Sequence, residues 1–340
     1  MMMRPVETCR DAAPRRAVLW LLLDLLAFQV AVRLLFEVLS SLGPWWRSSV
    51  LGREQIRLPY EIPANILALG AGVLLVLPVL RRVSSGESWA ALGLRRANSP
   101  GAWASGATIA AVVIGVAALM GLVLPQMTLG VWRKLGIWTG EDLALFVLVV
   151  APIFAALAEE VVYRGFMQSG LQRIHVGWGA VAAIVTFVGA HAWQGILSVL
   201  LFVLPGTILF TAARRLDPGL GPLMAAHLII DVAIFAGFFL CDARPDLHVV
   251  TCGLALVVSV GTLLATRRAF GALLAETRGW GSTLRGQALR HLPWVVGFVL
   301  GAGAITMAVQ QPRLPVLALG AVMVLILGGQ ALRRRRASNA

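Results

Sequence analysis

Five ionisable residues of this 340-residue chain lie inside long apolar stretches, where charged groups are rare: Glu159, Glu160, His191, His227 and Asp231. An ionisable side chain at membrane depth costs about 2.5–3.5 kcal/mol on insertion scales. A chain therefore keeps one there for function or for a structural pair. Carboxylates and imidazoles act as general acids and bases. Together they could activate a water molecule and stabilise the oxyanion that forms when a peptide bond is hydrolysed.

The two adjacent glutamates cannot share a partner on a helix, because consecutive side chains point about 100° apart. Glu160 and Arg164 are four residues apart and can form an ion pair along one helix face. Such a pair near a helix end could be purely structural. Glu159 has no cation three or four residues away, which makes it the stronger candidate for a general base.

The histidines are weak signals when each is taken alone. His191, four residues after Phe187, fits a packing residue as well as a ligand. His227 and Asp231 lie on one helix face, and they would equally suit a pair that ties two helices together. The combination is more informative, because three separate apolar runs each carry part of it. The carboxylate would activate water, one imidazole would hold that water or a metal ion, and the other pair would stabilise the oxyanion or relay a proton.

The elements that must position these residues are transmembrane helices. The chain is 59% hydrophobic and 13% charged, whereas soluble domains carry about 25% charged residues. About 20 apolar residues cross the hydrocarbon core of a bilayer. We predict an all-α, polytopic transmembrane helical bundle of about ten spans (eight to ten), at residues 17–42, 63–80, 101–124, 143–171, 178–194, 196–213, 220–240, 249–266, 293–310 and 314–332.

The placement of charge orients these spans. The net charge is +13, and arginines form short clusters in alternate loops. Such clusters mark cytoplasmic loops and contacts with anionic headgroups, so both termini are expected in the cytoplasm. A continuous basic face with interleaved aromatic residues is lacking, and we expect no nucleic-acid partner. The clusters are Arg15–Arg16, Arg81–Arg82, Arg95–Arg96, Arg214–Arg215, Arg267–Arg268 and Arg333 to Arg336.

Three other features fill in this layout. The segment 269–292 is short of apolar residues and is expected on the cytoplasmic surface as an amphipathic helix and loop. Cys9, Cys241 and Cys252 show no metal-binding or redox spacing, although the last two flank an external loop in positions compatible with a disulfide. Tryptophans near predicted span ends are expected in the interfacial belt: Trp45–Trp46, Trp89, Trp132, Trp138, Trp178, Trp280 and Trp294.

The helix lengths impose a constraint on any shared site. If the fourth span ended at Tyr163, Glu159 would lie about 6 Å from its cytoplasmic end, whereas His191 would lie roughly 20 Å inside the fifth span. The two side chains could then not meet. We therefore predict that the fourth helix continues to about Leu171.

The patterns EExxxR, FxxxH and HxxxD occur in this order, each in an apolar run. They resemble the CPBP family, which comprises the type II CAAX prenyl proteases, the Abi-type bacterial bacteriocin-processing proteins and their relatives. Leu92-Gly93-Leu94-Arg95-Arg96 is similar to a motif found upstream in bacterial members. The resemblance covers about residues 89–240. It implies a catalytic core at 89–240, preceded by a tail and two spans at 1–88 and followed at 241–340 by further spans and a basic tail.

The resemblance also implies a role for each residue. Glu159 would activate water, His191 would assist it, and His227 and Asp231 would line the oxyanion site. Eukaryotic members have asparagine where this chain has Asp231. An ionised aspartate cannot donate a hydrogen bond to an oxyanion, so Asp231 must be protonated, orient His227 or bind a metal ion. The remaining matched residues would support the site: Glu160, Arg164 and Phe187.

The cofactor is either absent or zinc. The family has been regarded both as zinc-type metalloproteases and as glutamate-dependent peptidases without metal. Glu159, His191 and His227 could form a catalytic zinc site. An HExxH helix, which would require that interpretation, is not present, and this favours water activation without metal.

These features predict an intramembrane endopeptidase that acts on a membrane-associated peptide or protein near the cytoplasmic leaflet. The rich Arg, Ala and Gly usage favours a high-GC bacterium and thus the inner membrane. Bacteria generally lack prenylated CAAX proteins, so processing of another peptide is expected. One alternative is a non-catalytic scaffold or bacteriocin immunity protein on the same fold, which would not need Glu159. Another is a proton-coupled transporter with a relay through Glu159, His191 and Asp231.

Overall fold

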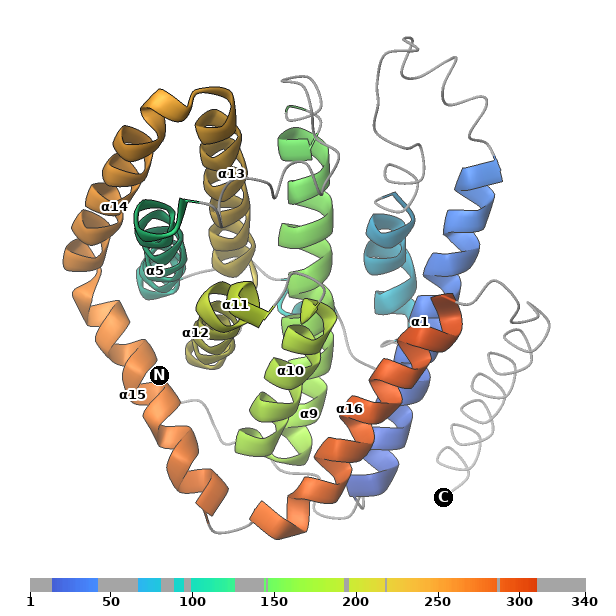
Figure 1. Ribbon diagram of the computed structural model, residues 1–340. Helices are drawn as coiled ribbons and strands as arrows, with labels where there is room; N and C mark the ends of the chain where they lie inside the picture. The colour runs from blue at the N-terminus through green and yellow to red at the C-terminus, as the bar shows by residue number, and fades with distance from the viewer. Residues whose placement is uncertain are drawn as a thin grey trace, which may run out of the picture.

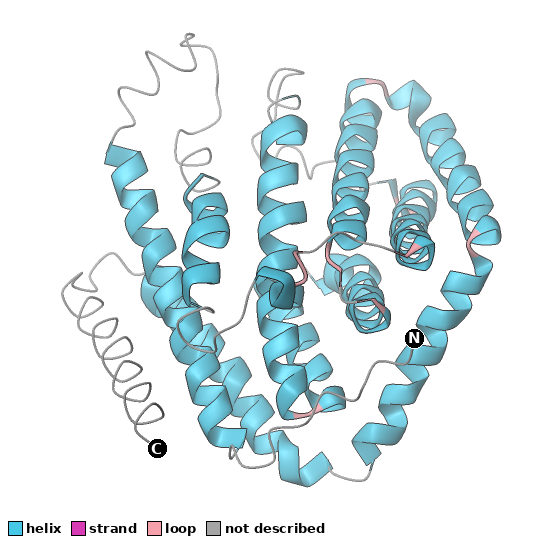
Figure 2. Ribbon diagram, turned by 180° about the vertical axis from the view of Figure 1, so that it is seen from behind, coloured by secondary structure: helices cyan, strands magenta, loops and turns pink. Residues whose placement is uncertain are grey.

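A computed structural model describes residues 14–41, 67–80, 89–94, 99–125, 144, 146–192, 196–217, 219–285 and 288–310. The described part of the chain is almost entirely helical, with short loops between helices, and contains no strand (Figure 2). Its elements are α1 (Pro14–Ser41), η1 (Gly72–Val76), η2 (Trp89–Leu92), α5 (Pro100–Val123), η3 (Phe146–Gln168), α9 (Ser169–Ile174), α10 (Val176–Ala190), α11 (Ile196–Ser198), η5 (Val199–Val203), α12 (Leu204–Leu216), α13 (Gly221–Ala243), η6 (Pro245–Leu247), α14 (His248–Ala265), α15 (Arg267–Arg285) and α16 (Ala288–Gln310).

The predicted all-α membrane bundle is confirmed. Described helices occupy the first nine predicted spans, whereas the tenth, at 314–332, lies outside the described residues together with both predicted tails. Three shorter apolar helices cover Leu67–Leu80, Val176–Ala190 and Leu292–Ile305. Within the described ranges, five helices are long and apolar enough to cross a membrane: Val18–Leu39, Pro100–Val123, Ile196–Leu216, Gly221–Ala243 and Pro245–Ala265.

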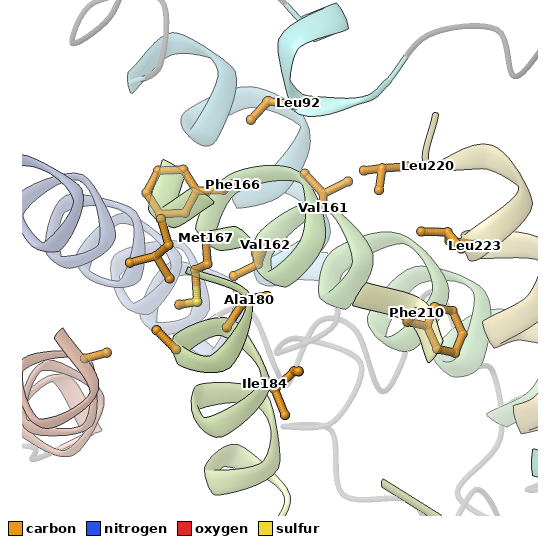
Figure 3. Close-up of a cluster of buried hydrophobic side chains, with 14 of the residues drawn as sticks. Leu92, Val161, Val162, Phe166, Met167, Ala180, Ile184, Phe210, Leu220 and Leu223 are labelled. Carbon is orange, nitrogen blue, oxygen red and sulfur yellow. The ribbon is translucent and has the colours of Figure 1, made fainter. Parts of the chain in front are cut away.

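The helix η3 lies in the middle of the bundle and contacts α10, α12 and α13 (Figure 1). Its apolar side chains are buried because neighbouring helices cover them, and inside a bilayer the close van der Waals contacts between helices favour this packing. Figure 3 shows the resulting core, in which η3 contributes Val161, Val162, Phe166 and Met167, α10 contributes Ala180 and Ile184, and the surrounding segments contribute Leu92, Phe210, Leu220 and Leu223.

A close backbone contact at Gly165 joins η3 to the segment that carries the LGLRR motif. A Cβ atom at this position would lie 2.6 Å from the Leu92 carbonyl oxygen, so only glycine allows the approach. Gly93 adopts a positive φ of 87°, and its carbonyl accepts a hydrogen bond of 2.9 Å from the Leu220 amide. Through these two contacts the segment Leu92–Gly93 connects η3 to the start of α13. The contacts thereby set the position of His227 along the axis of η3.

Two predictions concern the C-terminal region. The helix predicted within 269–292 is present as α15, which ends at Arg285. Arg215 of α12 pairs with Glu276 of α15 at 2.8 Å, and the position of α15 at the cytoplasmic surface stays a prediction. Trp280 and Trp294, in contrast, are each only 7% exposed. Neighbouring helices cover both rings, and their place in the interfacial belt stays a prediction. The division of the chain at residues 88 and 240 stays a prediction.

Candidate active site

Glu159, His191 and His227 come together from three helices. The Oε2 atom of Glu159 lies 3.6 Å from His191 Nε2 and 3.9 Å from His227 Nε2. This carboxylate oxygen is buried and has no hydrogen-bond partner among the described residues. Carboxylate and imidazole groups that are 32 and 68 positions apart in the chain therefore share one small volume.

The helical hairpin of η3, α9 and α10 explains why Glu159 and His191 meet. The fourth helix continues through α9 to Ile174, as predicted, and α10 begins at Val176 after a single extended residue. Glu159 lies 15 positions before Ile174, and His191 lies 15 positions after Val176. Since the two helices run in opposite directions from a tight turn, equal separations place the two side chains at similar depths.

The His191 ring is held by its own helix. Its Nδ1 atom lies 2.8 Å from the Phe187 carbonyl oxygen. A carbonyl can only accept, so Nδ1 carries a proton and donates. The ring also stacks on Phe187, with centroids 4.3 Å apart and an interplanar angle of 26°. These contacts direct Nε2 toward Glu159.

The His227 ring is held by the other glutamate. Its Nδ1 atom lies 2.8 Å from Glu160 Oε1, and the same oxygen lies 3.3 Å from Arg164 Nη1. The predicted Glu160–Arg164 pair is confirmed, with both side chains almost completely buried. The bond from Glu160 to α13 was not predicted. Adjacent side chains point in different directions from this π-helix, so Glu159 faces both Nε2 atoms while Glu160 binds Nδ1 of His227.

Aromatic rings form one wall of the site. The Arg164 guanidinium lies 4.0 Å from the ring centroid of Phe187 and 5.1 Å from that of Phe210. Phe210 also contacts the His227 ring at 5.4 Å, and Tyr163 packs edge-on against Phe187 at 4.9 Å. Sequence reasoning had missed Phe210 and had given Tyr163 no role in the site. An aromatic residue in an apolar run carries no signal that separates it from ordinary core.

Asp231 lies one turn after His227 on α13 and is partly buried. It is near enough for its charge to interact with those of His227, Glu159 and His191. The structure thus brings Asp231 into the electrostatic surroundings of the site, while the direct contacts to Glu159 come from the two imidazoles.

The donor types at the site suit a zinc ion. Catalytic zinc is held by imidazole nitrogen and carboxylate oxygen, and metal-binding histidines usually donate their other ring N–H to a carbonyl or carboxylate. Both Nδ1 atoms are engaged in this way. Both Nε2 atoms face the carboxylate that lacks a hydrogen-bond partner. Glu159, His191 and His227 are therefore the residues that would hold such an ion.

Residues 141–233 match a family model described as type II CAAX prenyl endopeptidase Rce1-like. Over this segment the chain is similar to the Rce1-like family. The match contains all five ionisable residues of the candidate site as well as Arg164 and Phe187. It confirms the resemblance to the CPBP proteases and implies a peptidase of the CAAX-protease type in a multi-pass membrane protein. Searches of curated proteins and of solved structures gave no match.

Proposed function

We propose that this protein is an intramembrane endopeptidase in which Glu159 activates the water that hydrolyses a peptide bond. One observation carries the proposal. The buried Oε2 of Glu159 lacks a hydrogen-bond partner among the described residues, yet it faces two imidazoles whose other nitrogens are already engaged. Burying such a group without a partner is costly. A non-catalytic scaffold has no use for a buried carboxylate without a partner, whereas a hydrolase can use it to activate water.

The hydrogen-bond directions support a bound water between these groups. When both rings are neutral and their Nδ1 atoms donate, each Nε2 atom presents a lone pair, and the Glu159 carboxylate is also an acceptor. Three acceptors that face one another need a shared donor. A water molecule supplies two protons, and Glu159 can remove one of them as a general base.

The proposed reaction then follows from the groups present. As Glu159 takes a proton from water, the hydroxide oxygen bonds to the carbonyl carbon of the peptide, and the carbonyl electron pair becomes an oxyanion. When the oxyanion collapses, the C–N bond breaks and Glu159 returns the proton to the departing amine. Glu160 accepts a hydrogen bond from Nδ1 of His227 and so holds this ring beside the position proposed for the oxyanion.

A zinc ion held by Glu159, His191 and His227 would supply a water of pKa about 7 and a Lewis acid. The scheme above does not require it, because Glu159 can accept the proton itself. Under either scheme, the hydrogen bonds from Phe187 and Glu160 keep the imidazoles in place.

The proposed position of the reaction is near the cytoplasmic leaflet of a bacterial inner membrane. His227 lies six residues after the start of α13, or about 9 Å along the helix axis. Arg214 and Arg215 end the preceding helix α12. If these arginines mark the cytoplasmic side, the site lies shallowly below that surface. The proposed substrate is a peptide or protein that approaches from the same side or through the bilayer.

The test is cleavage of membrane-anchored peptides by the purified protein in lipid nanodiscs, with a prenylated CAAX peptide among them and products identified by mass spectrometry. Glu159→Gln should lower the rate by about 10²–10⁴-fold, the usual contribution of a general base. Glu37→Gln is the matched control, since it removes an exposed carboxylate that pairs with Arg33 on α1, and it should retain the wild-type rate. Wild-type activity in Glu159→Gln would refute the proposal.

A chelator arm in the same assay decides the metal question. Loss of cleavage on chelation, restored by Zn²⁺, would assign a metal-bound water. A rate that does not change with chelator would assign water activation by Glu159 alone.

A further inference from the structure

A second group of reactive side chains lies at the other end of α13. Cys241 is in the last turns of α13, and His248 and Cys252 are four residues apart at the start of α14. One ligand atom from each residue lies within 4.8 Å of the other two, and Cys252 Sγ is 3.8 Å from His248 Nε2. Cys241 lies fourteen positions after His227, about 21 Å along the helix. This group is therefore distinct from the candidate active site.

The α13–α14 hairpin holds these three side chains in place before any ligand binds. The connection is only Arg244 and the short helix η6, and it is braced by two hydrogen bonds from Arg244 to Asp246, at 2.9 and 2.7 Å. On the inner side, the two cysteines pack against Ala118 of α5, and they are 1% and 5% exposed. A site that is already formed loses little conformational freedom when it binds.

We propose that Cys241, His248 and Cys252 bind a soft divalent metal ion of the Zn²⁺ class and thereby fasten the α13–α14 hairpin. Two thiolates and one imidazole are the ligands that zinc prefers. Charge also favours this ion, because two thiolates cancel a 2+ charge. The resulting neutral complex can lie among apolar helices without the cost of a buried net charge. Binding replaces the two thiol protons by the metal ion and releases both protons to solvent.

The absence of metal-ligand spacing, concluded from the sequence, is corrected by this geometry. Both cysteines are free thiols. Six residues separate Cys241 from His248 and three separate His248 from Cys252, and the fold of the hairpin turns this spacing into a three-ligand site. A disulfide between the cysteines is the competing state, because it would remove both thiolates.

The test is a titration of the full chain, purified in detergent under reducing conditions, with Co²⁺ as a spectroscopic substitute for zinc. The proposal predicts one equivalent bound with a thiolate-to-cobalt charge-transfer band, which Zn²⁺ displaces. Cys241→Ser and Cys252→Ser should abolish the band, and His248→Ala should weaken it. Cys9→Ser, the matched control, should keep it. The candidate active site has no sulfur ligand, so cobalt bound there cannot give this band.

A labelling experiment on the wild-type chain keeps the proposal testable if the cysteine variants fail to fold. Zn²⁺ should slow alkylation of Cys241 and Cys252 relative to chelator-treated protein, and leave alkylation of Cys9 unchanged. Three results would overturn the proposal: no charge-transfer band in the reduced wild type, equal alkylation with and without Zn²⁺, or a membrane-isolated protein whose mass is lower by two hydrogens because the cysteines are joined. Peptidase activity plays no part in these measurements.

Discussion

The two ends of α13 hold reactive side chains in different ways. Near its start, His227 is bonded to a glutamate on η3 and faces another, so its position depends on contacts between helices that are distant in the chain. Near its end, Cys241 meets residues of the next helix across a connection of four residues. The first group needs the whole bundle, whereas the second needs one hairpin. Damage to the core should therefore disrupt the first end more than the second.

The largest effect is expected from removing the positive charge of Arg164, which pairs with Glu160. Arg164→Met would leave the buried Glu160 carboxylate without its cation, and breaking a buried ion pair typically costs about 3–5 kcal/mol. We expect a loss of that size in the free energy of unfolding, measured in detergent.

The control lies at the other end of α13. Arg244→Met breaks the exposed Arg244–Asp246 pair, which solvent screens, and should change the free energy of unfolding far less. Equal losses of unfolding free energy in the two variants would show that the buried Glu160–Arg164 pair stabilises the fold no more than the exposed Arg244–Asp246 pair.

A smaller effect is expected at the contact that sets the height of α13. Gly165→Ala would bring a Cβ atom to 2.6 Å from the Leu92 carbonyl oxygen, and such overpacking costs about 1–3 kcal/mol. Gly253→Ala in α14 meets nothing within 4 Å and should be neutral or stabilising by up to about 1 kcal/mol. Thermal unfolding of both variants checks the difference. A Gly165→Ala variant as stable as the wild type would show that Gly165 does not approach the Leu92 carbonyl oxygen this closely.

The smallest effect concerns the ring that positions His191. Phe187→Leu keeps an apolar side chain but removes the stacked ring, and aromatic pairs contribute about 0.5–1.5 kcal/mol beyond their burial. The rate of cleavage per folded molecule should fall by about tenfold at most. Phe298→Leu, in the core but outside the site, should lose stability without changing that rate. A rate unchanged by Phe187→Leu would remove its positioning role.

Physical cost explains which parts of the sites could be predicted from sequence. Glu159, His191 and Asp231 were recognisable because ionisable groups in apolar helices are expensive and therefore informative. Cysteine carries no such cost, since a thiol behaves as a small apolar group. Cys241 and Cys252 were consequently dismissed as metal ligands, although their site needs only one helical hairpin and is simpler than the site around Glu159.

Other features depend on how helices rotate against one another, which a single sequence does not specify. The bond between Glu160 and His227 and the packing of Phe210 and Tyr163 are of this kind. The length of the fourth helix was predictable, because it followed from the requirement that Glu159 and His191 meet. The burial of Trp280 and Trp294 was not, since a tryptophan at a helix end suits both an interface and a core.

The most direct test of the central claim is a double-mutant comparison of cleavage rates. If Glu159 and His191 act as one unit on one water molecule, their effects are not additive. The Glu159→Gln/His191→Ala double variant should then retain the same residual rate as Glu159→Gln alone. Losses that multiply in the double variant would mean that the two side chains act independently, and would contradict a shared water-activating site.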